Sequence, residues 1–551
     1  MPQPSVLIVG AGPAGLILAI TLLQNGVPVR VINKEPAHRI GSRGAGIQPR
    51  TLELYDILAL LPEFEDALDR NIPAKRMYAL PGGTKVVKEF PVADWVEPTP
   101  GTPHANPVSI NQDIHEEILR SCLHKLSGTV ELGTELRSFE QFPDHVVAQI
   151  VKTGADGKET TESAKFDWLV GTDGAHSVVR KQLGLTFLGE TKTEERVALG
   201  DIVVEEGLDR GYWHYWIPPN QMMVLRPGSA DNKTYRFAYT GLPEHLKDRA
   251  MTRDEFVEEF YTATGRRDVK FGEATWLSNF KPNMRMVDKF GEGRVFVAGD
   301  AAHCHSPTGG QGLNSSVQDS ANLGWKLALV QKGLAPPALL ASYSEERLPV
   351  IAEMLKLTTA LHNATAARLA APGAADDGSA WKRGGDLNML GVNSRGSSIV
   401  LGAAADGGAS AYTEAAAPDG RVQAGFRAPD APGLVALRSS DAPTRLFNVF
   451  GAAAHTALVF GDDGSGGVAE ALRRVPAGVV RAVLLLPAGQ APAGVLAGFD
   501  SVLEDTAGHA YGGYGARNGD QMVVIVRPDG VVGAVVDGPE GVEQYFKLIL
   551  A

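Results

Sequence analysis

The segment Gly10–Gly15, with the sequence GAGPAG, constrains the fold more than any other part of the chain. It follows the apolar run Val6–Val9 and precedes a helical pattern from Leu16 to Asn25, which is the context that a dinucleotide-binding loop requires. The first glycine of such a loop permits a tight turn, the second lets the backbone approach a pyrophosphate, and the third allows close packing of helix and strand. A glycine-rich turn without a ligand is the weaker alternative. The predicted ligand contacts are Gly10, Gly12, Ala14 and Gly15.

The end of the second predicted strand, Val29–Ile32, departs from the usual pattern of such folds. An acidic residue normally binds the ribose at this point, about 20 residues after the glycines. Here Asn33 stands in that place, and Lys34 and Glu35 follow it. Asn33 can accept a hydrogen bond from a ribose hydroxyl through its amide oxygen, and Glu35 lies on the same side if the strand continues. We predict Asn33 as the ribose ligand, with a plain turn as the alternative.

The segment Val295–Asn314 places an acidic residue directly after another strand. The apolar run Val295–Ala298 is predicted to be a strand, Asp300 follows it, and a glycine-rich loop then opens a helix. Because ligands of α/β sheets bind at the carboxyl ends of the strands, Asp300 is expected to accept hydrogen bonds from a ribityl chain. Backbone N–H groups at the start of the helix are expected to face the electron-rich end of a flavin. They belong to Gly312, Leu313 and Asn314. A structural loop without a ligand is the weaker alternative for this segment.

A third segment, Asp167–Arg180, repeats this arrangement. Asp173 and Gly174 follow the predicted strand Trp168–Val170, and Ser177 lies one helical turn before Arg180. Taken alone, this segment is typical of an ordinary turn with a helix cap.

The chain divides into units of different pattern. Its 551 residues exceed the usual size of one compact core. Strands such as Tyr212–Ile217 and Tyr235–Tyr239 follow one another with few helices between them, which is typical of an antiparallel sheet. The predicted units are a discontinuous nucleotide-binding domain (1–184 and 290–370, the end of it helical from Leu313 to about Leu369), an antiparallel-sheet substrate domain (185–289), a linker with loops (371–424) and a C-terminal α/β domain (425–551).

The C-terminal unit is predicted from alternating strand and helix patterns. Its expected strands are Thr444–Val449, Ala457–Phe460, Val483–Leu486 and Met522–Val526, and its expected helices are Val468–Arg474 and Val542–Leu550.

Composition excludes several classes of protein. The formal net charge of -12 and the absence of a basic cluster argue against nucleic-acid binding. The apolar run Leu16–Leu23 is too short to span a bilayer, and no secretory signal precedes it, so a cytoplasmic location is expected. Two cysteines, Cys122 and Cys304, cannot form a disulfide framework. The triplet His303–His305 is too weak a pattern for a metal site, and none is predicted.

Taken together, the three loop motifs resemble those of the FAD-dependent aromatic hydroxylases, the class A flavoprotein monooxygenases. The match is closest to the phenol-hydroxylase-like branch and covers most of the chain. Further agreement comes from Arg43, Arg50–Glu53, Gln112 with Glu116 and Leu119, and Tyr343 with Glu346, Arg347 and Pro349.

The resemblance implies FAD as cofactor, NAD(P)H as a transient co-substrate, and molecular oxygen with a small aromatic compound as the other substrates. It implies hydroxylation of a phenolic or related ring through a flavin C4a-hydroperoxide. Arg43 and Gln112 would bind the phosphate and ribityl region, and Asp173 would serve both flavin and nicotinamide. Pro307 and Gly312 would line the isoalloxazine. The implied fold class is α/β: a Rossmann-like FAD-binding domain with an inserted antiparallel-sheet substrate domain and a C-terminal thioredoxin-like domain lacking CxxC.

One catalytic position departs from the family. Phenol hydroxylases carry an aspartate where Ala45 aligns, so the acid that would assist ionisation of a phenol is missing. Candidates to contact the substrate instead are expected on the antiparallel sheet: His214, Tyr215, Tyr239 and Arg285. Packing within the sheet is the stronger alternative for each of them.

Two other functions remain open at this stage. The same scaffold supports epoxidation, Baeyer-Villiger-type oxidation and reduction, because a fold does not fix a reaction. A catalytically silent flavin-binding protein is the other alternative. The C-terminal domain contains no cysteine, so a packing role, or a homodimer contact, is expected of it rather than thiol chemistry.

Overall fold

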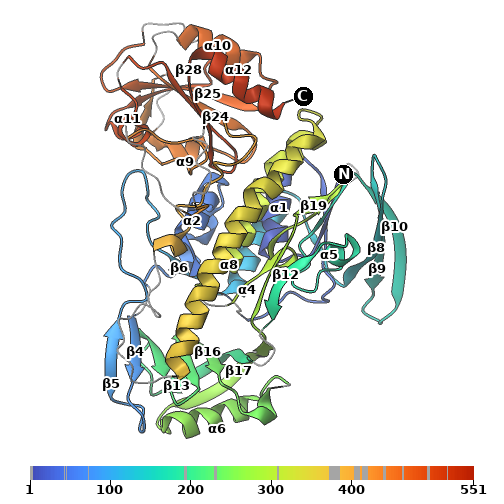
Figure 1. Cartoon of the computed structure of the whole chain (residues 1–551), viewed down its shortest axis with the longest axis vertical. Helices are drawn as coiled ribbons and strands as arrows, with labels where there is room; N and C mark the ends of the chain where they lie inside the picture. Colours follow the sequence, from blue (N-terminus) through green and yellow to red (C-terminus); the bar gives the residue numbers. More distant parts are fainter. Residues whose placement is uncertain are drawn as a thin grey trace.

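The computed structural model is built from three units stacked along its longest axis (Figure 1). It describes residues 4–41, 44, 46–71, 74–191, 195–228, 233–247, 249–306, 309–370, 385–402, 410–412, 420–437, 442–461, 465–492, 497–517 and 519–550. No helix among these residues is long and apolar enough to cross a membrane.

The middle unit contains a sheet with the strand order β19-β20-β11-β1-β2-β7. Strand β1 pairs in parallel with β2 and β11, and β11 pairs in parallel with β20, whereas β19 is antiparallel. The central strands are short apolar runs buried on both faces, as is usual for parallel sheets. The bounds are β1 (Val6–Val9), β2 (Val29–Ile32), β7 (Val130–Glu131), β11 (Trp168–Gly171), β19 (Gly291–Glu292) and β20 (Val295–Val297).

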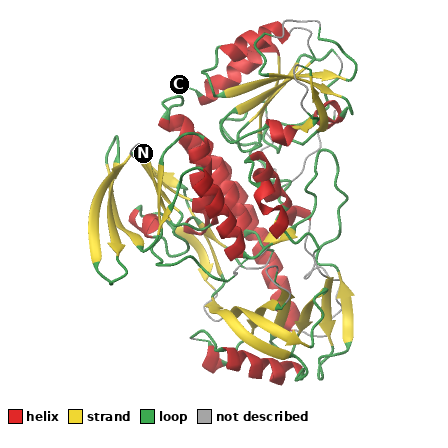
Figure 2. Ribbon diagram, turned by 180° about the vertical axis from the view of Figure 1, so that it is seen from behind, coloured by secondary structure: helices red, strands yellow, loops and turns green. Residues whose placement is uncertain are grey.

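Helices cover this sheet and form the red bundle at the centre of Figure 2. Helix α1 directly follows the glycine loop and packs against α7, where Ser320 donates a hydrogen bond to the carbonyl of Ala14 at 2.8 Å. The predicted helical region after Leu313 is confirmed as two helices, α7 and α8. The bounds are α1 (Pro13–Gln24), α2 (Pro49–Ile57), α3 (Leu61–Phe64), α4 (Gln112–Lys125), α5 (Val178–Gln182), α7 (Gly312–Gln331) and α8 (Ala341–Ala370).

The lower unit is a sheet with the order β17-β13-β16-β15-β14-β4-β5, which we call the roof sheet. It is antiparallel except where β14 pairs with β4. Its bounds are β4 (Ala74–Tyr78), β5 (Val86–Phe90), β13 (Val197–Glu206), β14 (Tyr212–Trp216), β15 (Met222–Pro227), β16 (Thr234–Thr240) and β17 (Lys270–Phe280).

Two strands of the roof sheet correct the predicted division of the chain. Strands β4 and β5 lie within residues 1–184, which were expected to belong to the nucleotide-binding domain, yet they form one edge of the roof sheet. Charged residues interrupt the apolar pattern of both strands, and β5, which forms the edge of the sheet, also has exposed residues.

The two faces of the roof sheet meet different neighbours. Helix α6 (Arg253–Thr264) covers one face with Phe256 and Phe260, which pack on Phe237 and Trp216. The opposite face turns toward the middle unit, as Figure 1 shows. There Arg236 donates a hydrogen bond to Asn111, at the start of α4.

Smaller elements connect these units. A three-stranded sheet of β8, β9 and β10 flanks the parallel sheet, and β12, β18 and β21 form another beside the loop after β20. The bounds are β3 (Gly46–Ile47), β6 (Val108–Ser109), β8 (Thr134–Gln141), β9 (Val146–Thr153), β10 (Glu159–Phe166), β12 (Phe187–Thr191), β18 (Asn283–Val287) and β21 (His303–Cys304).

The upper unit contains a seven-stranded sheet with the order β23-β22-β26-β25-β24-β27-β28. Three predicted strands and both predicted helices are confirmed, but Thr444–Val449 is a strand only at its start. From Leu446 it is helical, because Asp430 accepts the Phe447 N–H at 2.9 Å. Most of the predicted linker 371–424 lies outside the described residues. The bounds are β22 (Pro432–Ala436), β23 (Thr444–Arg445), α9 (Leu446–Val449), β24 (His455–Phe460), α10 (Ser465–Arg473), β25 (Val480–Pro487), β26 (Ser501–Asp505), α11 (His509–Tyr514), β27 (Met522–Val526), β28 (Val532–Asp537) and α12 (Gly538–Ile549).

A buried ionic network joins the upper unit to the middle one. The guanidinium of Arg527 donates to both carboxylate oxygens of Glu346 in α8 at 2.7 and 2.8 Å. Lys326 of α7 donates to the same carboxylate at 2.9 Å, and all three side chains are fully buried. Because breaking a buried ion pair leaves an uncompensated charge, this network fixes the two units together.

Candidate functional site

The glycine loop has the geometry that the sequence predicts. Gly10 adopts a φ of +107°, and a Cβ there would lie 2.3 Å from the carbonyl oxygen of Thr172. A Cβ on Gly15 would lie 2.0 Å from the Gly10 oxygen, whereas a Cβ on Gly12 would meet nothing within 4 Å. Gly10 and Gly15 are therefore required by packing, and Gly12 leaves open space beside the start of α1.

The residues after β2 present one polar group to this edge of the sheet. Asn33 is held by its backbone, since its N–H donates to Glu131 at 2.8 Å and its carbonyl accepts from Thr134 at 2.9 Å. Its side-chain amide makes no hydrogen bond with the described residues. Lys34 and Glu35 are exposed.

Asp173 is a helix-capping residue in this structure. Its carboxylate accepts hydrogen bonds from the Ser177 hydroxyl at 2.5 Å and from the Val178 N–H at 2.7 Å. Burial raises the pKa of Asp173 above its ordinary value, against the effect of these donors. Both oxygens thus hold the turn that begins α5, and just before this turn the Thr172 hydroxyl donates a hydrogen bond to the Gly10 carbonyl at 2.7 Å.

Asp300 lies at the end of β20 with its carboxylate exposed and accepting no hydrogen bond from the described residues. The turn that carries it is held from behind by Asp319 of α7. Asp319 accepts the Gly299 N–H at 3.0 Å, His303 at 2.7 Å and the Arg347 guanidinium at 2.7 Å. Burial would raise the pKa of Asp319, but the charges of His303 and Arg347 lower it below its ordinary value. Asp319 was not predicted from the sequence, although it lies in the predicted helical region after Leu313 and its partner Arg347 was among the residues that match the family.

The first turn of α7 meets a second part of the chain. Its first intrahelical hydrogen bond runs from Ser315 to the Gln311 carbonyl, so the N–H groups of Gly312, Leu313 and Asn314 precede the helical ladder. The fully buried Asn314 side chain accepts the Gln48 N–H at 2.8 Å and donates to the Gly46 carbonyl at 3.0 Å. Asn314 therefore fixes the segment after β2 to the helix start, a role that the sequence did not indicate.

Gln112 is the first residue of α4. It donates a hydrogen bond to Glu116 at 2.9 Å, and burial raises the pKa of Glu116 above its ordinary value. Arg43, Ala45 and Pro307, which the sequence also singles out, lie outside the described residues.

The four predicted substrate contacts do not share one site. His214 and Tyr239 point away from the middle unit, because strand alternation places them on the α6 side of the roof sheet. Tyr239 donates to Glu259 of α6 at 3.0 Å, and His214 bonds Tyr78 at 2.7 Å. Burial lowers the pKa of His214 to about 4.

Tyr215 and Arg285 occupy different surroundings. Tyr215 lies on the face of the roof sheet that turns toward the middle unit, where it packs with Met77 and Val224. Arg285 lies in β18, and its guanidinium donates to the Phe187 carbonyl at 2.9 Å and to Thr191 at 3.3 Å. Arg285 is thus engaged within its own small sheet.

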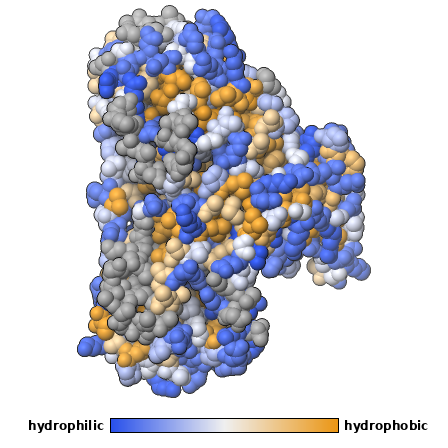
Figure 3. Space-filling model, viewed as in Figure 1, coloured by the Kyte–Doolittle hydropathy of each residue, from blue (hydrophilic) through white to orange (hydrophobic). Residues whose placement is uncertain are grey.

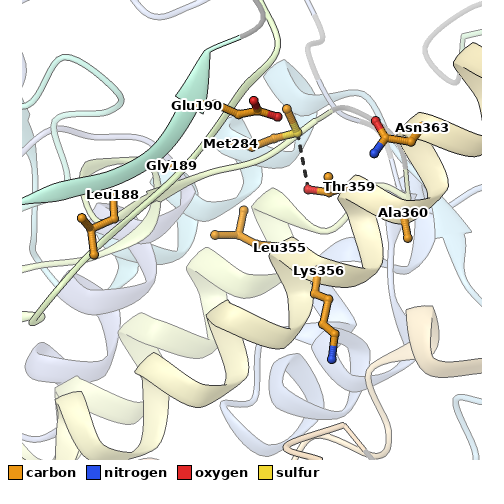
Figure 4. Close-up of a pocket in the computed structure, with 9 residues that line it drawn as sticks. All are labelled: Leu188, Gly189, Glu190, Met284, Leu355, Lys356, Thr359, Ala360 and Asn363. Carbon is orange, nitrogen blue, oxygen red and sulfur yellow. Dashed lines mark hydrogen bonds between the residues drawn. The ribbon is translucent and has the colours of Figure 1, made fainter.

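A cavity of about 650 Å³ opens between β12, β18 and α8 (Figure 4). Figure 4 shows the Met284 and Thr359 side chains pointing toward each other, and the Thr359 hydroxyl donates a hydrogen bond to the Met284 sulfur at 3.5 Å. It contains none of the residues expected to bind FAD. Its lining is Leu188, Gly189, Glu190, Met284, Leu355, Lys356, Thr359, Ala360 and Asn363.

The loops fit a flavin dinucleotide on observations of this structure. The open space at Gly12, the carboxylate of Asp300 and the amide of Asn33 lie at the carboxyl ends of β1, β20 and β2, three parallel strands of the same sheet. The N–H groups at the start of α7 complete an edge rich in hydrogen-bond donors. A phosphate chain needs such donors, and a ribityl or ribose hydroxyl needs such acceptors. Fold and site together define a dinucleotide-binding flavoprotein.

Comparison with known proteins assigns the family. Residues 3–358 match the family model described as FAD binding domain. A flavin-dependent monooxygenase of Mycobacteroides abscessus is 36% identical over 466 residues, which cover 83% of this chain and 88% of that protein. A 6-methylpretetramide 4-monooxygenase of Streptomyces rimosus is 36% identical over 372 residues, covering 66% of this chain and 63% of that protein.

A solved structure extends the likeness over the whole chain. The ternary complex of aklavinone-11 hydroxylase with FAD and aklavinone superposes with a TM-score of 0.75 at 27% identity, covering 100% of this chain and 99% of that one. The chain belongs to the FAD-binding-domain family of flavin-dependent aromatic monooxygenases. FAD is its cofactor, and NAD(P)H is the co-substrate typical of this family.

Proposed function

We propose that this monooxygenase hydroxylates a phenolic or related polycyclic aromatic compound between the FAD site and the roof sheet. The observation that carries the proposal is the aromatic character of the roof face that turns toward the middle unit. Strand alternation puts Trp213, Tyr215 and Trp276 on that face, opposite the face that packs on α6. A Cβ on Gly41 of the middle unit would lie 2.6 Å from the Trp276 ring, so this face adjoins the FAD-binding domain. The named substrates of relatives, 6-methylpretetramide and aklavinone, support the proposal.

In this proposal the residues of the chain bind and position the cofactor and the substrate. FAD, when bound, supplies the redox chemistry that takes a hydride from NAD(P)H and activates molecular oxygen. Gly12 would admit the pyrophosphate, Asn33 the ribose and Asp300 the ribityl chain. The N–H groups from Gly312 onward would stabilise negative charge at the end of the flavin ring. Of the four substrate candidates, Tyr215 is the one that we retain.

The roles of the remaining predicted residues follow from their positions. Asp173 would position the turn before α5 against the cofactor, and Gln112 would position the start of α4 against it. Arg43 and Pro307 are carried forward from the resemblance alone.

The upper unit is proposed to be thioredoxin-like, with a structural role. Its sheet and flanking helices support this, and Arg527 ties it to Glu346 of the FAD-binding domain. Figure 3 shows hydrophobic side chains gathered over this unit and across the middle of the molecule. Because exposed apolar patches often bind partners, we also propose a homodimer. The free cysteines Cys122 and Cys304 support a cytoplasmic location.

The proposal is tested with purified protein loaded with FAD. A panel of monocyclic and polycyclic phenols is screened for stimulation of NAD(P)H oxidation, and products are weighed by mass spectrometry. We expect polycyclic phenols to stimulate oxidation and to gain one oxygen atom. If only non-aromatic ketones or alkenes gain oxygen, the hydroxylase proposal fails in favour of another oxygenation on the same fold.

A further inference from the structure

A row of charged residues crosses the roof sheet on the face toward the middle unit. Asp201 of β13 pairs in register with Arg236 of β16, and Arg236 pairs with Arg226 of β15. On the next strands Trp213 pairs with Lys75. The neighbours of these residues, among them Tyr235, Phe237 and Leu225, belong to the core on the α6 side, so alternation turns the charged row the other way.

Aromatic rings line the row along its length. The guanidinium of Arg226 lies 5.0 Å from the centroid of Trp213. The ammonium of Lys75 lies 5.7 Å from the Phe90 ring and 5.9 Å from the Tyr215 ring. This arrangement of cations beside rings suits a ligand that is aromatic and carries negative charge.

Arg236 is buried and Arg226 is half-buried, and among the described residues neither arginine has partners for all of its donors. Arg236 is 5% exposed, and its described hydrogen bond goes to Asn111, while the Nε atoms of both arginines are buried and unbonded. Arg226 makes no hydrogen bond with the described residues. Burial, and next the charge of Arg226, lower the pKa of Arg236 to about 10, although Asp201, Asp113 and Asp69 act in the opposite direction. The nearby carboxylates therefore do not compensate the burial of this charge.

Such donors are costly to bury unless a ligand completes their hydrogen bonds. A carboxylate or an ionised phenol matches the flat fork of a guanidinium and would also offset the repulsion between the two arginines. Ionisation of a phenol activates its ring toward oxygen transfer, and Ala45 stands where the family has an acid for that purpose.

We propose that Arg226 and Arg236 form the subsite that binds an anionic oxygen of the aromatic substrate, either a ring carboxylate or an ionised phenol. The subsite selects ionised aromatic compounds over neutral ones of the same shape. This inference rests on the proposed function, because it places the substrate against the roof sheet.

The test measures binding without turnover, by the change in the absorption spectrum of the oxidised FAD-loaded enzyme. The probes are anthraquinone-2-carboxylate, its methyl ester, and 1,2-dihydroxyanthraquinone above and below its own phenol pKa. The variants are Arg226→Gln, Arg236→Lys and Arg236→Gln, with Arg76→Gln as the matched control. Arg76 lies on the same sheet but pairs with Glu89 at its surface. FAD content and thermal unfolding report whether each variant folds.

We expect the wild type to bind the carboxylate at least tenfold more tightly than the ester. Losing a charge-assisted hydrogen bond should weaken carboxylate binding about 10- to 100-fold in Arg226→Gln and Arg236→Gln, and leave ester binding within threefold. Arg236→Lys should retain part of the preference for the carboxylate over the ester, and Arg76→Gln should retain all of this preference. If the ionised phenol alone shows this pattern, the anionic oxygen is a phenolate; if the carboxylate alone shows it, the oxygen is a carboxylate.

Two results would overturn the inference in different ways. If charged and neutral probes bind equally, or lose affinity equally in the arginine variants, the subsite is absent while the proposed aromatic substrate class survives. If no anthraquinone perturbs the flavin spectrum at all, the proposed substrate class and the subsite fail together.

Discussion

Two alanine substitutions in the first glycine loop, at Gly12 and at Gly15, test where the cofactor binds, because each adds one methyl group. Gly12 has a φ of -76°, which any residue adopts, and a Cβ there meets no atom within 4 Å. Gly12→Ala should therefore change the stability of the apoprotein by no more than about 1 kcal/mol. In the loaded enzyme the same methyl group would enter the space that we propose for the pyrophosphate. Losing one charge-assisted hydrogen bond costs about 1.5–3 kcal/mol, so FAD binding should weaken roughly 10- to 100-fold.

Gly15→Ala is the matched variant one helical turn away. Its Cβ would lie 2.0 Å from the Gly10 oxygen and 2.7 Å from the Thr172 hydroxyl, so the loop or helix must shift. Such overpacking costs about 1–3 kcal/mol, which should lower the unfolding midpoint of the apoprotein itself. Quenching of FAD fluorescence gives the dissociation constant, and circular dichroism of the apoprotein gives the midpoint. If Gly12→Ala binds FAD within threefold of the wild type, the pyrophosphate does not lie over Gly12 and the reasoning is refuted.

Three further results are expected. Asp319→Asn leaves the charge of the buried Arg347 uncompensated, which should lower the free energy of unfolding by about 3–5 kcal/mol and weaken FAD binding. The control is Asp288→Asn at an exposed position. Unchanged FAD affinity in Asp319→Asn would contradict this prediction. Arg527→Met should lower the free energy of unfolding by a similar amount. In urea, the upper unit should then unfold in a transition separate from the loss of flavin fluorescence. A single transition at the wild-type midpoint would contradict the role of the network. Burial lowers the pKa of His115 to about 3, so the folded state excludes a proton that the unfolded chain binds below pH about 6.5. The stability that His115 contributes is complete above that pH and is lost as pH falls toward 3, and His115→Gln should flatten the acid side of a urea-midpoint profile.

The sequence predicted the glycine loop and the place of the acid after β20 because these signals are local. The turn at Gly10, the close packing at Gly15 and the acid after β20 each depend on a few consecutive residues. Strand and helix patterns in the middle unit were likewise confirmed, since buried parallel strands read as continuous apolar runs.

The contacts that hold this edge in place were not predictable, because they join distant segments. Asn314 bonds the backbone of Gly46, and Asp319 bonds that of Gly299, through pairings that only the tertiary fold creates. The face of the roof sheet that we propose for the substrate could not be predicted for another reason. An alternating strand has two faces, and the sequence did not tell which one α6 would cover, so His214 was weighed equally with Tyr215.

The most direct test of the account is the fate of molecular oxygen. FAD-loaded enzyme, NAD(P)H and a polycyclic phenol that stimulates oxidation are incubated under ¹⁸O₂, and the product is weighed. The account predicts one labelled oxygen atom on the aromatic ring for each hydroxylation. Label derived from water, or NAD(P)H oxidation that yields hydrogen peroxide alone with every aromatic compound, would contradict it.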